Sequence, residues 1–100
     1  MRLNLFQVHQ IKSAVKVIFG DEAKLWVFGA QLGDRQRSTD VELYVEAGPH
    51  GNASVQKTEL LCLLHREFTN LTIDVTIRKP QQSLTDLQRN AIQNGVALNP

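Results

Sequence analysis

The chain has 100 residues, of which 42% are hydrophobic and 21% are charged, and its formal net charge is +1. This composition is typical of an ordinary folded domain and argues against intrinsic disorder. The near-neutral charge gives no support to a basic nucleic-acid surface, so nucleic acid is not an expected partner. We expect one domain that covers residues 1–100.

Three further features bear on the compartment in which the protein works. Cys62 is the only cysteine, so no disulfide bond can form within the chain. The N-terminal segment carries scattered charges and lacks the continuous apolar core of a signal peptide. No run of about 18 apolar residues is present, so we expect no membrane-spanning segment and no membrane partner. The sequence therefore predicts a cytoplasmic protein.

The first part of the chain is expected to form a helix, a strand and a loop. Apolar residues recur at spacings of three and four across residues 5–19, which predicts a helix that Gly20 ends. Residues 25–28 are apolar on both faces and predict a short, well-covered strand. Residues 30–33 are expected to form one helical turn, and residues 34–39 a polar loop.

Two later segments alternate polar and apolar residues and predict strands with one polar face. Residues 40–46 place Val41, Leu43 and Val45 on one side and Asp40, Glu42 and Tyr44 on the other. Residues 71–77 alternate in the same way, with Asp74 on the polar side. Because sequential strands are usually neighbours, we expect Asp40, Glu42 and Asp74 to converge on one face of a sheet.

Two helices are expected around the second of these strands. Residues 54–68 form a helix whose crowded leucines cannot all lie on one narrow stripe: Leu60, Leu61, Leu63 and Leu64. This helix is either buried on two sides or in contact with another chain, for which a homodimer and a helical partner both fit. Residues 78–82 are expected to form a loop, and Ser83 to cap a last helix over residues 84–93. The elements predict an α+β domain with a small mixed β-sheet, helices packed on one face and acids on the other.

Three converging carboxylates repel one another unless they are protonated, well solvated or bound to a cation. Oxygen ligands on a rigid sheet suit Mg²⁺, which commonly shares its coordination with substrate phosphates. Two such ions can clamp the attacking and leaving oxygens of phosphoryl transfer. Gly29 and Ala30 follow the first strand, where backbone N–H groups can approach a phosphate.

The ordered set of these motifs resembles the DNA polymerase β-like nucleotidyltransferase superfamily, and most closely its minimal nucleotidyltransferases. The sequence "VFGA" is similar to the apolar strand that ends in the family's glycine motif. The family's acid-x-acid pair is matched by "DVEL", and its third acid by "TIDVTI". The closing "IQNGVAL" is also similar to the family's ending. The resemblance covers nearly the whole chain and implies a nucleotidyltransferase-like fold.

The resemblance implies an enzyme that transfers a nucleotidyl group, AMP in the expected case, from ATP or another NTP to a hydroxyl, with two Mg²⁺ ions. Asp40, Glu42 and Asp74 would ligate the metals, and Asp74 would help to activate the acceptor hydroxyl. Gly29 and Ala30 would lie against the β- and γ-phosphates. Minimal members commonly pair with a helical HEPN protein, and in some toxin–antitoxin pairs the transferase adenylylates its HEPN toxin.

Three features depart from the family pattern and leave a second prediction open. Ala30 replaces the usual serine or glycine, and Glu42 is longer than the usual aspartate. Gln31 and Leu32 stand where many minimal members carry arginines. The alternative is a catalytically degenerate binding module that acts through protein–protein contacts. An enzyme is expected to keep its three carboxylates close together and open to solvent, whereas in a binding module Glu42 or Asp74 could turn aside into a salt bridge.

Overall fold

The computed structural model describes residues 3–28 and 40–98. Within these ranges the elements follow in the order α1 (Leu5–Phe19), β1 (Lys24–Phe28), β2 (Asp40–Glu46), α2 (Ala53–Glu67), β3 (Thr72–Arg78), α3 (Asp86–Asn94) and β4 (Val96–Ala97). The helical turn expected at residues 30–33 and the loop expected at residues 34–39 lie outside the described residues.

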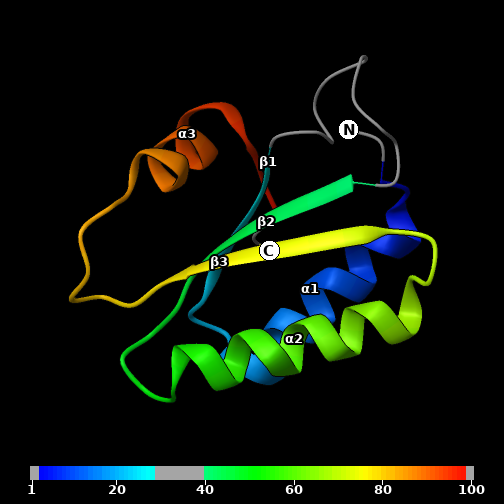
Figure 1. Cartoon of the computed structure of the whole chain (residues 1–100), viewed down its shortest axis with the longest axis horizontal. Helices are drawn as coiled ribbons and strands as arrows, with labels where there is room; N and C mark the ends of the chain where they lie inside the picture. Colours follow the sequence, from blue (N-terminus) through cyan, green and yellow to red (C-terminus); the bar gives the residue numbers. More distant parts are fainter. Residues whose placement is uncertain (1–2, 29–39, 99–100) are drawn as a thin grey trace.

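The strands of the described chain form one mixed sheet in the order β3-β2-β1-β4 (Figure 1). β2 runs parallel to β3 and antiparallel to β1, and β4 adds to the other side of β1 in the antiparallel sense. The parallel pair is joined through α2, since parallel neighbours need a long crossover connection. This arrangement confirms the predicted α+β class with a small mixed sheet.

The main core lies between the sheet and the helices α1 and α2, which pack side by side on one face (Figure 1). Alternate strand residues point into it, and the buried ones are Leu25, Val27, Val41, Leu43, Val45, Ile73 and Val75. Ile11 and Val15 of α1 and Leu60 and Leu64 of α2 complete it. The period-2 pattern therefore identified the core residues of β2, whereas the apolar stripe expected on the first helix includes Leu5, which is exposed.

α3 packs on the opposite face of the sheet, where the sequence pattern predicted only a polar surface. Phe28 of β1, Tyr44 of β2 and Ala91 of α3 form a second buried cluster. Trp26 packs against this cluster and stacks on Tyr44, with ring centroids 5.2 Å apart. The acidic residues therefore share their face with a small aromatic core.

α3 begins two residues later than expected, and Ser83 is wrong as its cap. The N-cap is Thr85, whose side-chain oxygen accepts a hydrogen bond from the Gln88 backbone N–H. The Gln88 side chain accepts one in return from the Thr85 backbone N–H, which completes a capping box. Gln88 is also buried, and its amide donates to Thr76 Oγ1 at 3.3 Å. The cap thus ties α3 to β3.

The leucine-dense helix α2 buries two of its leucines within its own chain. Leu60 and Leu64 are 0% and 1% exposed, and Leu61 packs against the same core as a partly buried residue. The helix lies against both α1 and β3. Packing within the chain therefore accounts for Leu60, Leu61 and Leu64, and contact with a homodimer or a helical partner stays a prediction.

Lys79 stabilises the connection between β2 and α2 through side-chain hydrogen bonds. Its Nζ donates hydrogen bonds to the backbone oxygens of Gly48 at 3.2 Å and His50 at 2.7 Å, and to Gln56 Oε1 at 3.1 Å. We expect Lys79→Met to lower the free energy of unfolding by about 1–2 kcal/mol, because the aliphatic stem is kept while these bonds are lost. Urea unfolding followed by circular dichroism measures the change. Lys24→Met, at an exposed position, is the control, and equal effects of the two substitutions would contradict the role of Lys79.

Candidate functional site

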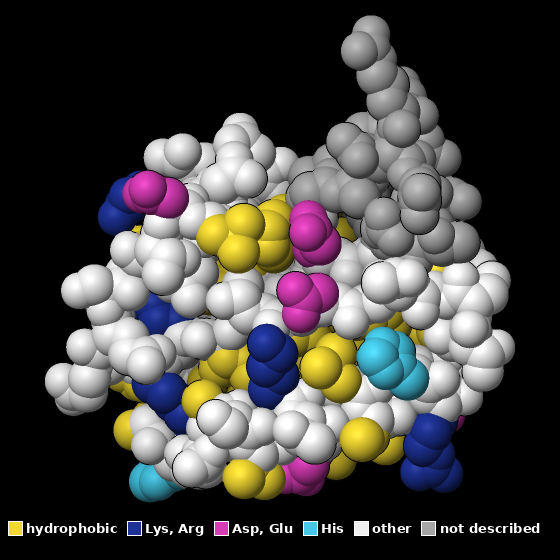
Figure 2. All heavy atoms as spheres, viewed as in Figure 1, with side chains coloured by type: hydrophobic (Ala, Val, Ile, Leu, Met, Phe, Trp, Pro, Cys, Tyr) yellow, Lys and Arg dark blue, Asp and Glu magenta, His cyan; other side chains and the backbone are white. Residues whose placement is uncertain are grey.

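Two of the three predicted acids stand next to each other on the sheet. Glu42 and Asp74 are register partners across β2 and β3, and Phe28 is the partner of Glu42 on β1. The alternation along both strands puts the two carboxylates on the face opposite the main core. Glu42 is half-buried, and the Asp74 side chain is 78% exposed. Figure 2 shows acidic side chains beside each other over β2 and β3, with hydrophobic and basic side chains nearby.

The third predicted acid is described only by its backbone. Asp40 begins β2, two residues before Glu42, and its register partner on β3 is Thr72. The phosphate-binding residues predicted from the sequence, Gly29 and Ala30, lie outside the described residues. Among the described side chains, no three His, Cys, Asp or Glu residues form a group that could hold a metal ion. A complete group of three acids therefore depends on Asp40.

One carboxylate oxygen of Asp74 has two partners other than Glu42. Asp74 Oδ1 accepts a hydrogen bond from the Val75 backbone N–H at 2.9 Å and lies 4.0 Å from Lys57 Nζ of α2. The side chains of this ion pair are 45% and 78% exposed, so the pair contributes at most about 1 kcal/mol. The contact is of the kind expected in a binding module, but it is too weak to prevent Asp74 from changing rotamer.

A hydrogen-bond cluster beside the acids was missed from the sequence. Tyr44 Oη donates to Glu46 Oε2 at 2.8 Å and accepts from Arg78 Nε at 3.1 Å. Arg78 also donates to Glu46 Oε2 at 3.1 Å and to the Gln82 backbone oxygen at 2.7 Å. Arg78 was expected in a loop, yet it ends β3 as the register partner of Glu46. The sequence did indicate that Arg78 belongs to the strand, because the alternation that places Asp74 on the polar face continues to position 78.

Comparison with known proteins adds no family to this picture. The chain matches no family model, no curated protein and no solved structure. None of the helices in the described ranges is both long and apolar enough to cross a membrane. The case for a function therefore rests on the residues and their geometry.

Burial of Tyr44 is expected to make the stability of the fold sensitive to alkaline pH. Burial raises the pKa of Tyr44 to about 12; the hydrogen bond from Arg78 opposes this rise, and Glu46 adds to it. The folded state thus favours the protonated phenol. The contribution of this preference to the free energy of unfolding is complete below about pH 10 and is lost as the pH rises toward about 12. We expect the free energy of unfolding to fall by on the order of 2 kcal/mol across this interval.

Two measurements check this expectation. Tyr44 is the only tyrosine in the chain, so the ultraviolet absorbance of tyrosinate reports its ionisation directly. Urea unfolding of Tyr44→Phe should show a smaller loss of stability at alkaline pH than the natural protein. A tyrosinate midpoint near the ordinary value of about 10 would contradict the burial of the phenol.

Proposed function

We propose that this domain is a Mg²⁺-dependent nucleotidyltransferase, which moves a nucleotidyl group, AMP in the expected case, from ATP to a hydroxyl on a helical HEPN-type protein partner. The observation that carries the proposal is the register pairing of Glu42 with Asp74 on an accessible face of the sheet. The ordered motifs that resemble the minimal nucleotidyltransferases support it.

The described carboxylates fit a magnesium site by their chemistry and their support. Mg²⁺ takes oxygen ligands, and the residues that would hold it are Asp40, Glu42 and Asp74. Beneath them, Val41 and Leu43 are each 1% exposed and anchor β2 in the main core. A strand held in this way keeps its outward-facing side chains in position for a cation.

Each residue has a definite task in the proposed reaction. Bound metal would neutralise charge on the transferring phosphoryl group and orient it. Asp74, as the more exposed of the two described acids, would accept the proton of the acceptor hydroxyl. The acceptor oxygen forms a bond to the α-phosphate while the bond to the β-phosphate breaks, and pyrophosphate leaves. Gly29 and Ala30 would lie against the β- and γ-phosphates.

Calorimetric titration of ATP into the protein, with and without Mg²⁺, tests the proposal. We expect binding in the micromolar to millimolar range only when Mg²⁺ is present. Asp40→Ala and Glu42→Gln should each weaken it at least tenfold, since each removes a charged ligand. Asp86→Asn is the matched control, because the Asp86 side chain is 101% exposed and lies on α3. A folded protein that does not bind ATP in the presence of Mg²⁺ would contradict the proposed enzymatic function.

The contact between Asp74 and Lys57 favours a second candidate function, a degenerate binding module. Such a module would bind its partner equally well with and without Asp40→Ala, and it would not bind ATP. Co-purification of the partner with both proteins, followed by mass spectrometry, separates the two functions. Addition of one AMP to the partner in the presence of ATP and Mg²⁺ identifies the enzyme, and capture without modification identifies the module.

A further inference from the structure

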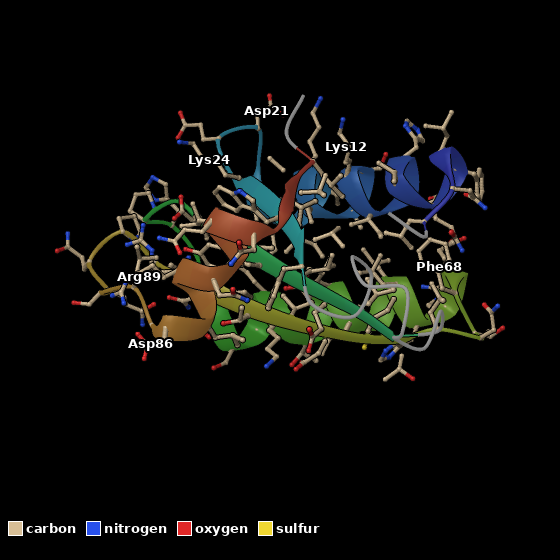
Figure 3. The ribbon with its side chains drawn as sticks, turned by 90° about the horizontal axis from the view of Figure 1, so that it is seen from above. Lys12, Asp21, Lys24, Phe68, Asp86 and Arg89 are labelled. Carbon is tan, nitrogen blue, oxygen red and sulfur yellow. The ribbon has the colours of Figure 1, made fainter. Side chains whose placement is uncertain are left out.

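A cavity of about 360 Å³ lies between α1 and the edge of the sheet formed by β1 and the segment after β4. α1 packs on the face of the sheet opposite Glu42 and Asp74, so this cavity is separate from the acidic site. Its lining includes polar residues of α1 and apolar residues of the core. Figure 3 shows two of its residues, Lys12 and Asp21, along the same side of the molecule.

The rim of the cavity carries more positive than negative charge. Lys12 and Lys16 are one helical turn apart on α1, and both line the cavity, as does Asp21. Lys16 Nζ lies 3.5 Å from Asp21 Oδ1, but the side chains are 71% and 79% exposed, so water and salt screen this pair strongly. Within residues 3–28 and 40–98, Lys12 has no ion-pair partner. Among the described residues, the Lys12 ammonium group beside the cavity therefore has no ion-pair partner.

The floor of the cavity is apolar and fixed. Val15, Leu25 and Leu98 line it and are 4%, 2% and 7% exposed. The Leu98 backbone N–H donates to the Leu25 backbone oxygen at 2.8 Å, which holds the C-terminal side of the floor against β1. These three side chains therefore offer a small apolar surface at the base of the cavity.

We propose that this cavity binds a small amphiphilic carboxylate, with a straight alkyl chain along Val15, Leu25 and Leu98 and its carboxylate beside Lys12 and Lys16. Ligand pockets typically enclose about 300–1,000 Å³, have mostly apolar walls and contain a few polar groups that orient the ligand. Two lysines one turn apart are separated by about 6 Å along the helix, so one carboxylate can approach both.

The size of the cavity favours a small molecule, rather than a protein, as its ligand. Ten of the described residues line it. A stable protein–protein interface uses about 20–30 residues from each partner. The excess of lysine over aspartate on the rim favours an anion, and the apolar floor favours an alkyl chain.

Titration of decanoate into the full chain, below the concentration at which it forms micelles, tests the proposal by NMR. We expect saturable shifts of the backbone amides of Lys12, Ser13, Ala23 and Leu98. Shortening the chain to octanoate and then hexanoate should weaken binding by roughly two- to fourfold for each CH₂ removed. Decanol has the same chain without the charge and should bind at least tenfold more weakly, because it cannot pair with the lysines.

A matched pair of variants tests whether Lys12 binds the carboxylate of the ligand. Lys12→Gln should weaken decanoate binding about five- to tenfold. Lys24→Gln should leave it unchanged within twofold, because Lys24 lies at the start of β1 and does not line the cavity. Circular dichroism checks that both variants fold. Absence of saturable binding, equal binding of decanol, shifts centred on Glu42 and Asp74, or equal effects of the two lysine variants would each overturn the proposal.

Discussion

Gly95→Ala is expected to lower the free energy of unfolding by about 3 kcal/mol, because the added methyl group has no space. Gly95 joins α3 to β4 with φ −83°, so its backbone conformation is open to any residue. A Cβ at this position would lie 2.8 Å from the Val27 backbone oxygen, 3.1 Å from Phe28 Cβ and closer still to the Ala91 backbone oxygen. Two of these neighbours are backbone atoms, so α3 or β1 itself must move to admit the methyl group.

Urea unfolding followed by circular dichroism measures this loss. Gly48→Ala is the matched control, because a Cβ at Gly48 meets nothing within 4 Å. We expect the control to change the free energy of unfolding by less than about 0.5 kcal/mol. If Gly95→Ala were as mild as Gly48→Ala, α3 would not pack against β1 as closely as the structure shows.

Arg78→Met is expected to lower the free energy of unfolding by about 2–3 kcal/mol, since it removes the cation from a largely buried cluster. The side chains of Arg78 and Glu46 are only 22% and 21% exposed. Hydrogen bonds to Tyr44 and Glu46 raise the pKa of Arg78, so its guanidinium stays charged across the accessible pH range. Without the guanidinium, the Glu46 carboxylate keeps only the hydrogen bond from the Tyr44 hydroxyl among those of the cluster. The Gln82 backbone oxygen loses the hydrogen bond that Arg78 donates.

An exposed arginine provides the comparison for Arg78. Arg89 pairs with Asp86 at 2.9 Å, but those side chains are 53% and 101% exposed, so Arg89→Met should cost less than about 0.5 kcal/mol. A double-mutant cycle with Arg78→Met and Glu46→Gln should give a coupling energy of about 1 kcal/mol or more. Additive effects of these two substitutions would contradict the cluster.

The sequence predicted the strands well where alternation was strong. The strand expected at residues 40–46 is β2 (Asp40–Glu46), because apolar residues alternate along its whole length. The side-by-side placement of Glu42 and Asp74 was also predictable, because the two strands follow each other and share the same period. Convergence with Asp40, and the roles of Gly29 and Ala30, remain predictions.

The rest of the site depends on contacts between residues that are far apart in sequence. The approach of Lys57 to Asp74 is set by the placement of α2 beside β3 and by a side-chain rotamer, neither of which a periodic pattern encodes. The position of α3 was missed for a related reason. Tyr44 was assigned to a polar face by alternation alone, although an aromatic ring there offers apolar area for a helix to cover.

The stacked pair of Trp26 and Tyr44 gives the molecule its own optical probe. Each is the only residue of its type in the chain. At a centroid separation of 5.2 Å, energy absorbed by the phenol passes efficiently to the indole, so nearly all emission comes from one ring on the acidic face. A ligand that settles beside Glu42 and Asp74 would change the indole emission, whereas one in the cavity beside α1 lies across the sheet from it. Intrinsic emission can therefore tell the two faces apart without a chemical label.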